Sequence, residues 1–197
     1  MGLLCSSDDS KEHSLEHYLQ KPILDVLKQR LPWLVGLLIF QSFSAVILGA
    51  FQDLLEDHLL ISFFVPMIVG TGGNAGNQPG VMITRALGSN EVNGDNFPKI
   101  MRKEGKLALS TALILGMVSF IRVIVGSPTE YLAALCIGLT IFAVVLISVF
   151  LGIGFSVLLD RLNIDPADAA ALLLTTMADM IGILALCLIS ASVFGQV

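Results

Sequence analysis

The chain has 197 residues, of which 55% are hydrophobic and only 14% are charged. A mean hydropathy of +0.84 excludes an ordinary soluble globular domain and indicates a membrane protein. The net charge of −5 gives no reason to expect nucleic acid as a partner. Cys5, Cys136 and Cys187 have no metal-binding spacing, so we expect neither a disulfide framework nor a zinc site. We also expect no organic cofactor.

We interpret residues 1–30, which are polar and mixed in charge, as a cytoplasmic leader. Leucine and isoleucine recur at helical spacing between Leu15 and Leu27, which predicts a short amphipathic helix at the membrane surface. The leader lacks the basic start and apolar core of a cleavable signal peptide. The opening Met-Gly-Leu-Leu-Cys-Ser fits the myristoylation pattern, but so short a match also arises by chance, so lipidation is left open.

Residues 31–197 are predicted to form an all-α integral membrane domain of five transmembrane helices. Pro32 suits the first turn of the first span, and Trp33 suits the headgroup level. A short turn around Pro128 separates the third span from the fourth. The five expected spans cover residues 31–51, 59–87, 106–125, 131–159 and 166–193, with a loop at 88–105.

The second span is predicted to be a broken helix. Between Pro66 and Pro79 it contains four glycines together with Asn74, Asn77 and Gln78. Irregular or polar backbone at membrane depth survives only where it is buried in protein or lines a watery cavity, and glycine- and proline-interrupted spans are typical of transporter sites. Close helix packing would explain the glycines but not the three amides, so we favour a cavity-lining role.

Basic residues are distributed unevenly over the expected loops. With five spans, ten of the eleven Lys and Arg residues fall on the N-terminal side, and Arg122 alone falls on the other. Because cytoplasmic loops carry the excess of Lys and Arg, we expect a cytoplasmic N-terminus and a C-terminus outside. We expect the membrane to be the cell (inner) membrane. The ten are Lys11, Lys21, Lys28, Arg30, Arg85, Lys99, Arg102, Lys103, Lys106 and Arg161.

One of the sixteen acidic residues, Asp179, lies deep within a span, between runs of leucine and isoleucine. A lone carboxylate among lipid tails is costly, so such a residue faces a protein interior or a water path and is a functional candidate. Burial as a neutral acid is the structural alternative, whereas an ion pair lacks a Lys or Arg at that depth. Thr175, Thr176 and Gly182 share its face at helical spacing, which favours a pathway wall.

The fifth span opens with the sequence Asp165-Pro166-Ala167-Asp168. Asp165 can cap the helix, Pro166 fits the first helical position, and Asp168 favours the positive end of the helix dipole. Asp168 lies on nearly the same face as Asp179, roughly 16 Å away along the axis. A capped helix explains this motif fully, and an acidic cytoplasmic mouth that gathers cations is the functional alternative.

The polar groups on these faces are carboxylate, amide, hydroxyl and carbonyl, all of them oxygen donors. Hard cations such as Mg²⁺ and Ca²⁺ match such ligands, although oxygen ligands alone do not separate Mg²⁺ from Mn²⁺ or Co²⁺. One carboxylate per chain is too little to strip Mg²⁺ of its waters. We therefore expect a homodimer in the lipid bilayer, with two Asp179 side chains across its axis holding a hydrated ion.

The segment from Pro66 to Gln78, followed by Arg85-Ala86-Leu87, resembles the second membrane helix of the MgtE magnesium transporters and the related solute carrier family 41. Asp165-Pro166-Ala167, with Asp179 fourteen residues on, resembles the start of that family's fifth helix, and the similarity covers the whole membrane part. It implies a homodimeric channel or transporter with Mg²⁺ as the transported ion and Asp179 holding that ion near the dimer interface. The predicted metal-site residues are Asp179, Asn77, Asn74, Thr175, Gly182, Asp165 and Asp168.

Two departures from the family pattern bear on the mechanism. Bacterial members carry a cytosolic N domain and a CBS pair that close the pore when Mg²⁺ is plentiful, and about thirty leader residues can form neither. Family helix five also commonly has a small or amide residue and then proline where this chain has Ala171-Leu172. We therefore expect feedback to be absent or supplied by another protein, and a carrier coupled to a second ion stays open.

Two other classes of protein compete with this interpretation. An intramembrane aspartyl protease needs two carboxylates at one site, whereas Asp179 is the single deep one and no Gly-x-Gly-Asp pattern surrounds it, so we do not expect an enzyme. A non-conducting membrane subunit or scaffold is the alternative that we retain. It would leave Asp179 and the amides Asn74, Asn77 and Gln78 without a role.

Overall fold

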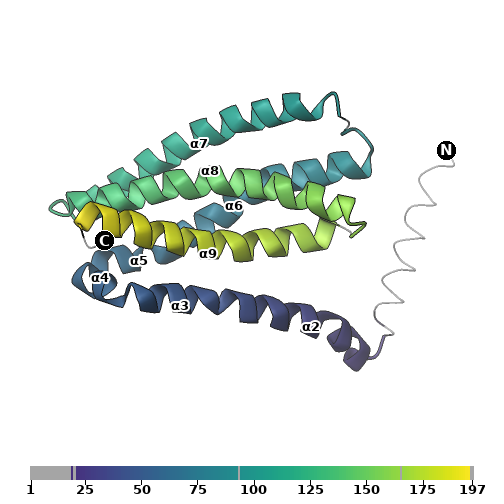
Figure 1. Cartoon of the computed structure of the whole chain (residues 1–197), viewed down its shortest axis with the longest axis horizontal. Coiled ribbons are helices and arrows are strands. Elements are labelled where there is room, and N and C mark those ends of the chain that lie inside the picture. Colours follow the sequence, from purple (N-terminus) through teal and green to yellow (C-terminus); the bar gives the residue numbers. More distant parts are fainter. Residues whose placement is uncertain (1–18, 20, 93, 165, 196–197) are drawn as a thin grey trace. The chain divides into compact units, whose positions relative to one another are not determined.

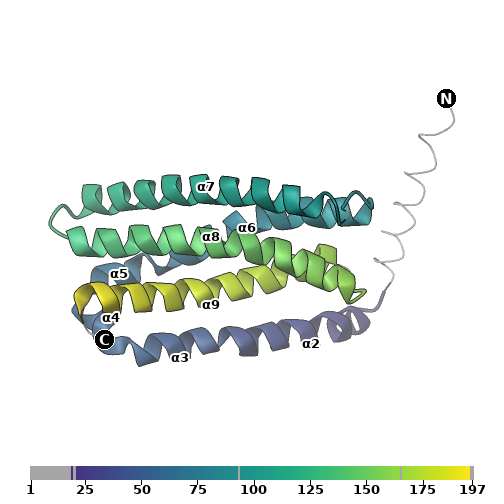
Figure 2. The ribbon, with the colours of Figure 1, turned by 45° about the horizontal axis from the view of Figure 1, so that its top comes forward.

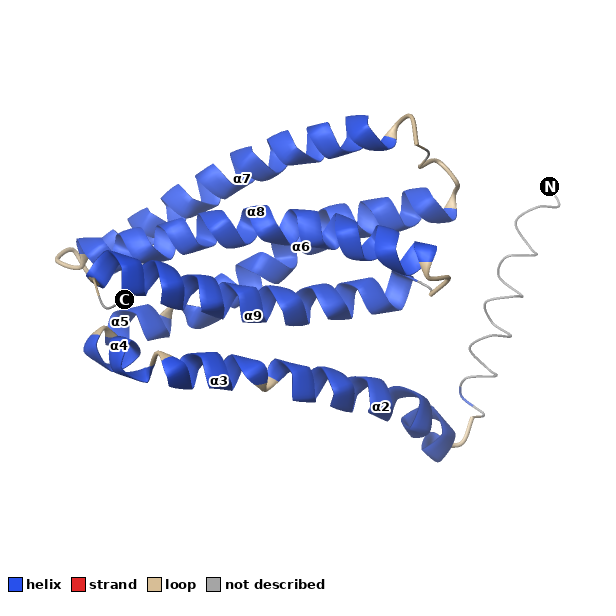
Figure 3. Cartoon of the chain, in the orientation of Figure 1, coloured by secondary structure: helices blue, strands red, loops and turns tan. Residues whose placement is uncertain are grey.

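The computed structural model describes residues 19, 21–92, 94–164 and 166–195, and every regular element in these ranges is an α-helix (Figure 3). This result confirms the predicted all-α class. The predicted leader helix falls partly outside the described residues. The helices are α2 (Ile23–Gln41), α3 (Phe43–Ala50), α4 (Gln52–Asp57), α5 (Leu59–Phe63), α6 (Val65–Gly88), α7 (Phe97–Gly126), α8 (Tyr131–Arg161) and α9 (Pro166–Phe194).

Contacts divide the chain into two units, Met1–Ile39 and Phe40–Val197. In the first unit α2 begins at Ile23, and the carbonyl of Pro22 accepts N–H groups of the first helical turn at 3.0 and 3.3 Å. Pro32 therefore lies inside α2, and the prediction that it occupies a first turn is wrong. Neighbouring groups in a membrane protein satisfy the carbonyl that an internal proline leaves free, which makes this position tolerable.

The second span is interrupted upstream of its glycine-rich stretch. Phe64 separates α5 from α6, and α6 then runs as one helix through all four glycines and Pro79. The prediction of a break between Pro66 and Pro79 is therefore wrong in position. Neighbouring helices pack directly against Gly72, Gly73 and Gly76, and this packing compensates for their low helix propensity.

The loop predicted at residues 88–105 is shorter than expected, because α7 already begins at Phe97, with Pro98 in its first turn. At 24 residues, α6 is also long enough to cross a bilayer, at about 1.5 Å per residue. Since α6 qualifies by its length and four other stretches qualify by both length and composition, the described residues contain four to five candidate spans, and the exact number of five stays a prediction. The four stretches of the described residues that are both long and apolar enough to span a membrane are Ile23–Ala50, Phe97–Gly126, Tyr131–Arg161 and Ala169–Phe194.

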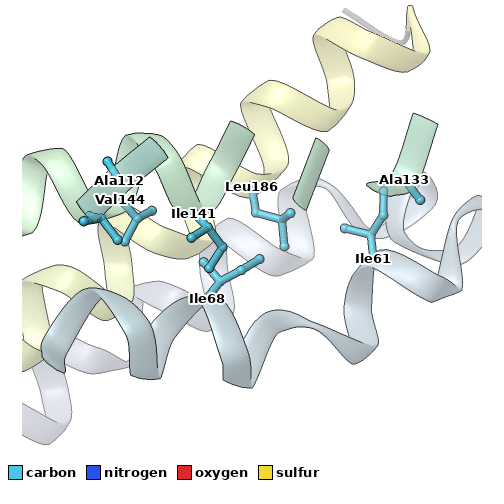
Figure 4. Packing of buried hydrophobic residues seen from close by; sticks show 8 residues of the cluster. Ile61, Ile68, Ala112, Ala133, Ile141, Val144 and Leu186 are labelled. Carbon is cyan, nitrogen blue, oxygen red and sulfur yellow. The ribbon is translucent and has the colours of Figure 1, made fainter. Parts of the chain in front are cut away.

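In the second unit α8 is the central helix. It packs against α6, α7 and α9, and α6 also packs against α9 (Figures 1 and 2). Ile68 of α6, Ile141 and Val144 of α8, and Leu186 of α9 are at most 1% exposed and meet in one cluster (Figure 4). Because lipid chains are themselves apolar, van der Waals packing rather than exclusion from water holds such helices together.

Glycines set the closest approaches between these helices. A Cβ atom on Gly76 would collide with the backbone carbonyl of Ser148, and one on Gly152 would collide with the carbonyl of Gly76. Between α7 and α8, a Cβ on Gly116 would lie 3.0 Å from the carbonyl oxygen of Gly138. Small residues at these crossings therefore allow backbone-to-backbone contact.

A hydroxyl network joins α6 to α8. Thr84 Oγ1 donates to Ser156 Oγ at 3.0 Å, and Ser156 Oγ lies 3.0 Å from the carbonyl oxygens of Gly80 and Gly152, so its single proton is shared between them. We expect Ser156→Ala to lower the free energy of unfolding by about 1 kcal/mol, the scale of interhelical hydrogen bonds in membranes. Thermal unfolding in detergent measures the loss. Ser192→Ala, which removes a bond within one helix, is the control, and an equal effect of both changes would contradict an interhelical role.

Candidate ion-binding site

Asp179 lies near the middle of α9 and is partly buried. Its Oδ2 accepts a hydrogen bond from Nε2 of Gln41, at 3.0 Å, at the point where α2 gives way to α3. The donor is a neutral amide, so it orients the carboxylate without cancelling its negative charge. Such a carboxylate is suited to bind a cation. A carboxylate that already forms an ion pair with Lys or Arg is less suited, because its charge is neutralised.

Glycines lie where α6 and α9 pack together. A Cβ on Gly73 would lie 3.4 Å from Cγ2 of Thr175, and one on Gly182 would lie 3.4 Å from Cγ2 of Ile68. Thr175 and Gly182, both predicted site residues, therefore lie where α9 packs on α6. These contacts favour the packing interpretation for the glycines, whereas the amides need a separate explanation.

The hydroxyl of Thr175 is turned toward its own helix. It lies 3.1 Å from the carbonyl oxygen of Ala171 and 3.0 Å from that of Leu172. Its proton is therefore engaged, and its oxygen is available as an acceptor, the property that a water of a hydrated cation requires.

The three amides of α6 are divided between two cavities. Asn77 lines a small cavity of about 140 Å³ between α6, α8 and α9, together with Thr84, Arg85 and Leu174. Asn74 and Gln78 line a different cavity of about 500 Å³ between α6, α7 and α8. The predicted amide group is thus split, and Asn77 is the member that faces α9, the helix of Asp179.

The acidic start of the fifth span is described only in part. Asp165 lies outside the described residues, and Asp168 belongs to α9 without a described side chain. Its predicted role as a cation-gathering mouth stays a prediction.

Sequence reasoning missed two polar residues that the fold brings to these places. Gln41 is the one amide among residues 31–51, and its position in an apolar span was a signal that could have identified it. Glu104 lines the larger cavity beside Asn74 and was assigned to a loop, because the start of α7 was placed too late.

Within the described part of the chain, no three His, Cys, Asp or Glu side chains come together in a way that could hold a metal ion. Asp179 has one described side-chain partner, the Gln41 amide, and the cavity that Asn77 lines does not include Asp179, so the described acceptors are few and spread along α9. Such a set matches a cation that keeps its water shell, because the waters supply the direct ligands.

Comparison with known proteins identifies the family. The family model described as "MgtE: Divalent cation transporter" matches residues 65–189, which include α6 and Asp179. The chain is similar to proteins named magnesium transporter MgtE, with 28% identity over 79% of this chain for Bacillus subtilis, 28% over 82% for Enterococcus faecalis and 31% over 79% for Thermus thermophilus. These matches cover 34%, 35% and 34% of the respective relatives, so the chain spans about a third of their length.

The match bears out the resemblance to this family, and the matched residues include the glycine-rich segment and Asp179. It also confirms the expected class, a multi-pass membrane protein of a transporter family rather than an enzyme. The chain belongs to the MgtE family of divalent cation transporters.

Proposed function

We propose that this chain carries Mg²⁺ across the cell membrane as a channel or transporter, and that Asp179 binds the hydrated ion. The observation that carries the proposal is the Asp179 carboxylate, partly buried in the middle of a spanning helix with a neutral amide as its hydrogen-bond donor. Its place inside the family match, and the name magnesium transporter given to the relatives, support Mg²⁺ as the substrate.

The ion is proposed to pass with most of its waters. Mg²⁺ releases water reluctantly, and an outer-shell site needs acceptors for the hydrogens of bound water instead of a dense cage of ligands. Asp179, Asn77 and Thr175 offer such acceptors. Gly182 packs beside Ile68, so its proposed part is to let α9 lie close to α6 near the site. Mn²⁺ and Co²⁺ have the same ligand preference and are the expected competitors.

The pathway is proposed to lie near the interface of a homodimer. A single chain supplies one carboxylate at this depth, and a two-fold axis beside α9 would add a second Asp179 facing the first. With the N-terminus in the cytoplasm and the C-terminus outside, Asp165 and Asp168 would form an acidic entrance on the cytoplasmic side, at the start of α9.

Mg²⁺ flux into liposomes containing the purified chain tests the function, with Ca²⁺ and Mn²⁺ as competitors and protein-free liposomes as the control. We expect flux that saturates with Mg²⁺ and that Mn²⁺ inhibits. If the folded, reconstituted protein shows no flux, this proposal is wrong, and the chain is better interpreted as a non-conducting membrane subunit.

The two asparagines of α6 offer a test of which cavity belongs to the pathway. Asn77→Ala is expected to raise the KM for Mg²⁺ about tenfold, the usual scale for losing an outer-shell partner of a metal. Asn74→Ala changes the same residue type one turn away, but in the cavity shared with α7, so its effect should be much smaller. Concentration-dependent flux measures both, and a larger effect at Asn74 would move the pathway to that cavity.

A further inference from the structure

Gln41 is placed so that its amide holds the proposed ion-binding carboxylate. It is the last residue of α2, Ser42 separates it from α3, and its Nε2 lies 3.0 Å from Oδ2 of Asp179. We propose that Gln41 is a positioning residue of the ion pathway, which fixes the direction of the Asp179 carboxylate and thereby sets affinity and selectivity for the hydrated cation. This inference rests on the proposed function of Asp179.

The position of Gln41 supports a functional role. Polar side chains are costly at membrane depth unless they find a partner, and Gln41 is the one amide among residues 31–51. The interruption between α2 and α3 follows it directly, at Ser42. The hydrogen bond to Asp179 joins the first span to the fifth across 138 residues of sequence.

The chemistry of an amide donor suits a transport site. A Lys or Arg at this position would neutralise Asp179 and compete with the cation, whereas an amide donates a hydrogen bond and leaves the full negative charge. With Oδ2 occupied by Gln41, Oδ1 can accept a hydrogen from a water of the ion. The Gln41 side chain also carries a carbonyl oxygen, Oε1, which is an acceptor for a second water hydrogen.

A hydrogen bond with only a structural role would stabilise the fold without changing the affinity for Mg²⁺. The KM for Mg²⁺ and the competition by Ca²⁺ therefore distinguish a structural role of Gln41 from a positioning role. Gln41→Leu removes the donor at similar size, and we expect the KM for Mg²⁺ to rise about tenfold with the maximal rate retained, the scale for losing one hydrogen bond to a charged group. Gln41→Glu puts a second carboxylate beside Asp179. Since Ca²⁺ accepts direct carboxylate ligands more readily than Mg²⁺, this variant should shift competition toward Ca²⁺.

The chain supplies a matched control. Gln52 also donates through Nε2 to a carboxylate, Glu56 at 2.6 Å, but on the exposed surface of α4. Gln52→Leu therefore removes the same chemical group and should leave the KM and the Ca²⁺ competition unchanged.

The experiment measures flux in proteoliposomes for wild type, Gln41→Leu, Gln41→Glu, Gln52→Leu and Asp179→Ala. Flux that depends on Asp179, with a raised KM in Gln41→Leu and stronger Ca²⁺ competition in Gln41→Glu, supports the inference. Flux that depends on Asp179 but has wild-type KM and selectivity in both Gln41 variants overturns the role of Gln41 alone. Equal flux in wild type and Asp179→Ala overturns the proposed site, and the inference with it.

Discussion

Asp179→Ala is expected to abolish Mg²⁺ flux while the protein still folds and assembles. The substitution removes the carboxylate that we place against the hydrated ion, and one lost charge at a low-dielectric site outweighs the remaining amide and hydroxyl acceptors. The side chain is partly exposed in a single chain, so its truncation leaves little of the packed core disturbed. Flux in proteoliposomes, beside size-exclusion chromatography of the same preparation, separates loss of transport from loss of folding.

Asp179→Asn tests whether flux depends on the negative charge of the side chain or on its size. It keeps the size of the side chain and an acceptor oxygen, but it removes the negative charge, so we expect flux close to that of Asp179→Ala. Asp160→Ala is a suitable control, because Asp160 is an exposed carboxylate near the end of α8. Wild-type flux in both Asp179 variants would contradict the assignment of Asp179 to the pathway and would direct the search to the cavity beside Asn74.

Local patterns predicted the long apolar helices well. The boundaries of α8 and α9 follow from composition, from the turn around Pro128, and from the proline that opens α9. Asp179 was identified because a single carboxylate in an apolar helix is anomalous without any knowledge of its neighbours. These features depend on residues close together in the sequence.

Features that depend on distant segments were less predictable. The glycines of α6 looked like a helix break, because their low helix propensity is visible in the sequence while the packing against Ser148, Gly152 and Thr175 is not. The contact between Gln41 and Asp179 likewise joins the first span to the fifth. The division of Asn74 and Asn77 between two cavities depends on which neighbour each face of α6 meets, and helical periodicity does not give that information.

The second large effect is expected at the crossing of α6 and α8. Gly152→Ala should strongly destabilise the fold, because the added methyl group would collide with the carbonyl of Gly76, and backbone cannot rotate away as a side chain can. Overpacking in a tight core costs about 1–3 kcal/mol, and a clash with backbone should reach at least the upper end. Thermal unfolding of the detergent-solubilised protein measures the loss, together with the yield of monodisperse protein.

A glycine two residues away provides the control and gives the opposite sign. A Cβ on Gly154 would meet nothing within 4 Å, and alanine favours a helix over glycine by about 0.8–1.0 kcal/mol, so Gly154→Ala should leave stability unchanged or raise it. The pair Gly76→Ala and Gly70→Ala repeats the comparison on α6, since Gly70 also has open space. Equal stability of Gly152→Ala and Gly154→Ala would contradict backbone contact at this crossing. If Gly152→Ala and Gly76→Ala are destabilised while Gly154→Ala and Gly70→Ala are not, Gly76 of the second span acts in helix packing. The selectivity of the proposed pathway must then come from Asp179 and from side-chain amides.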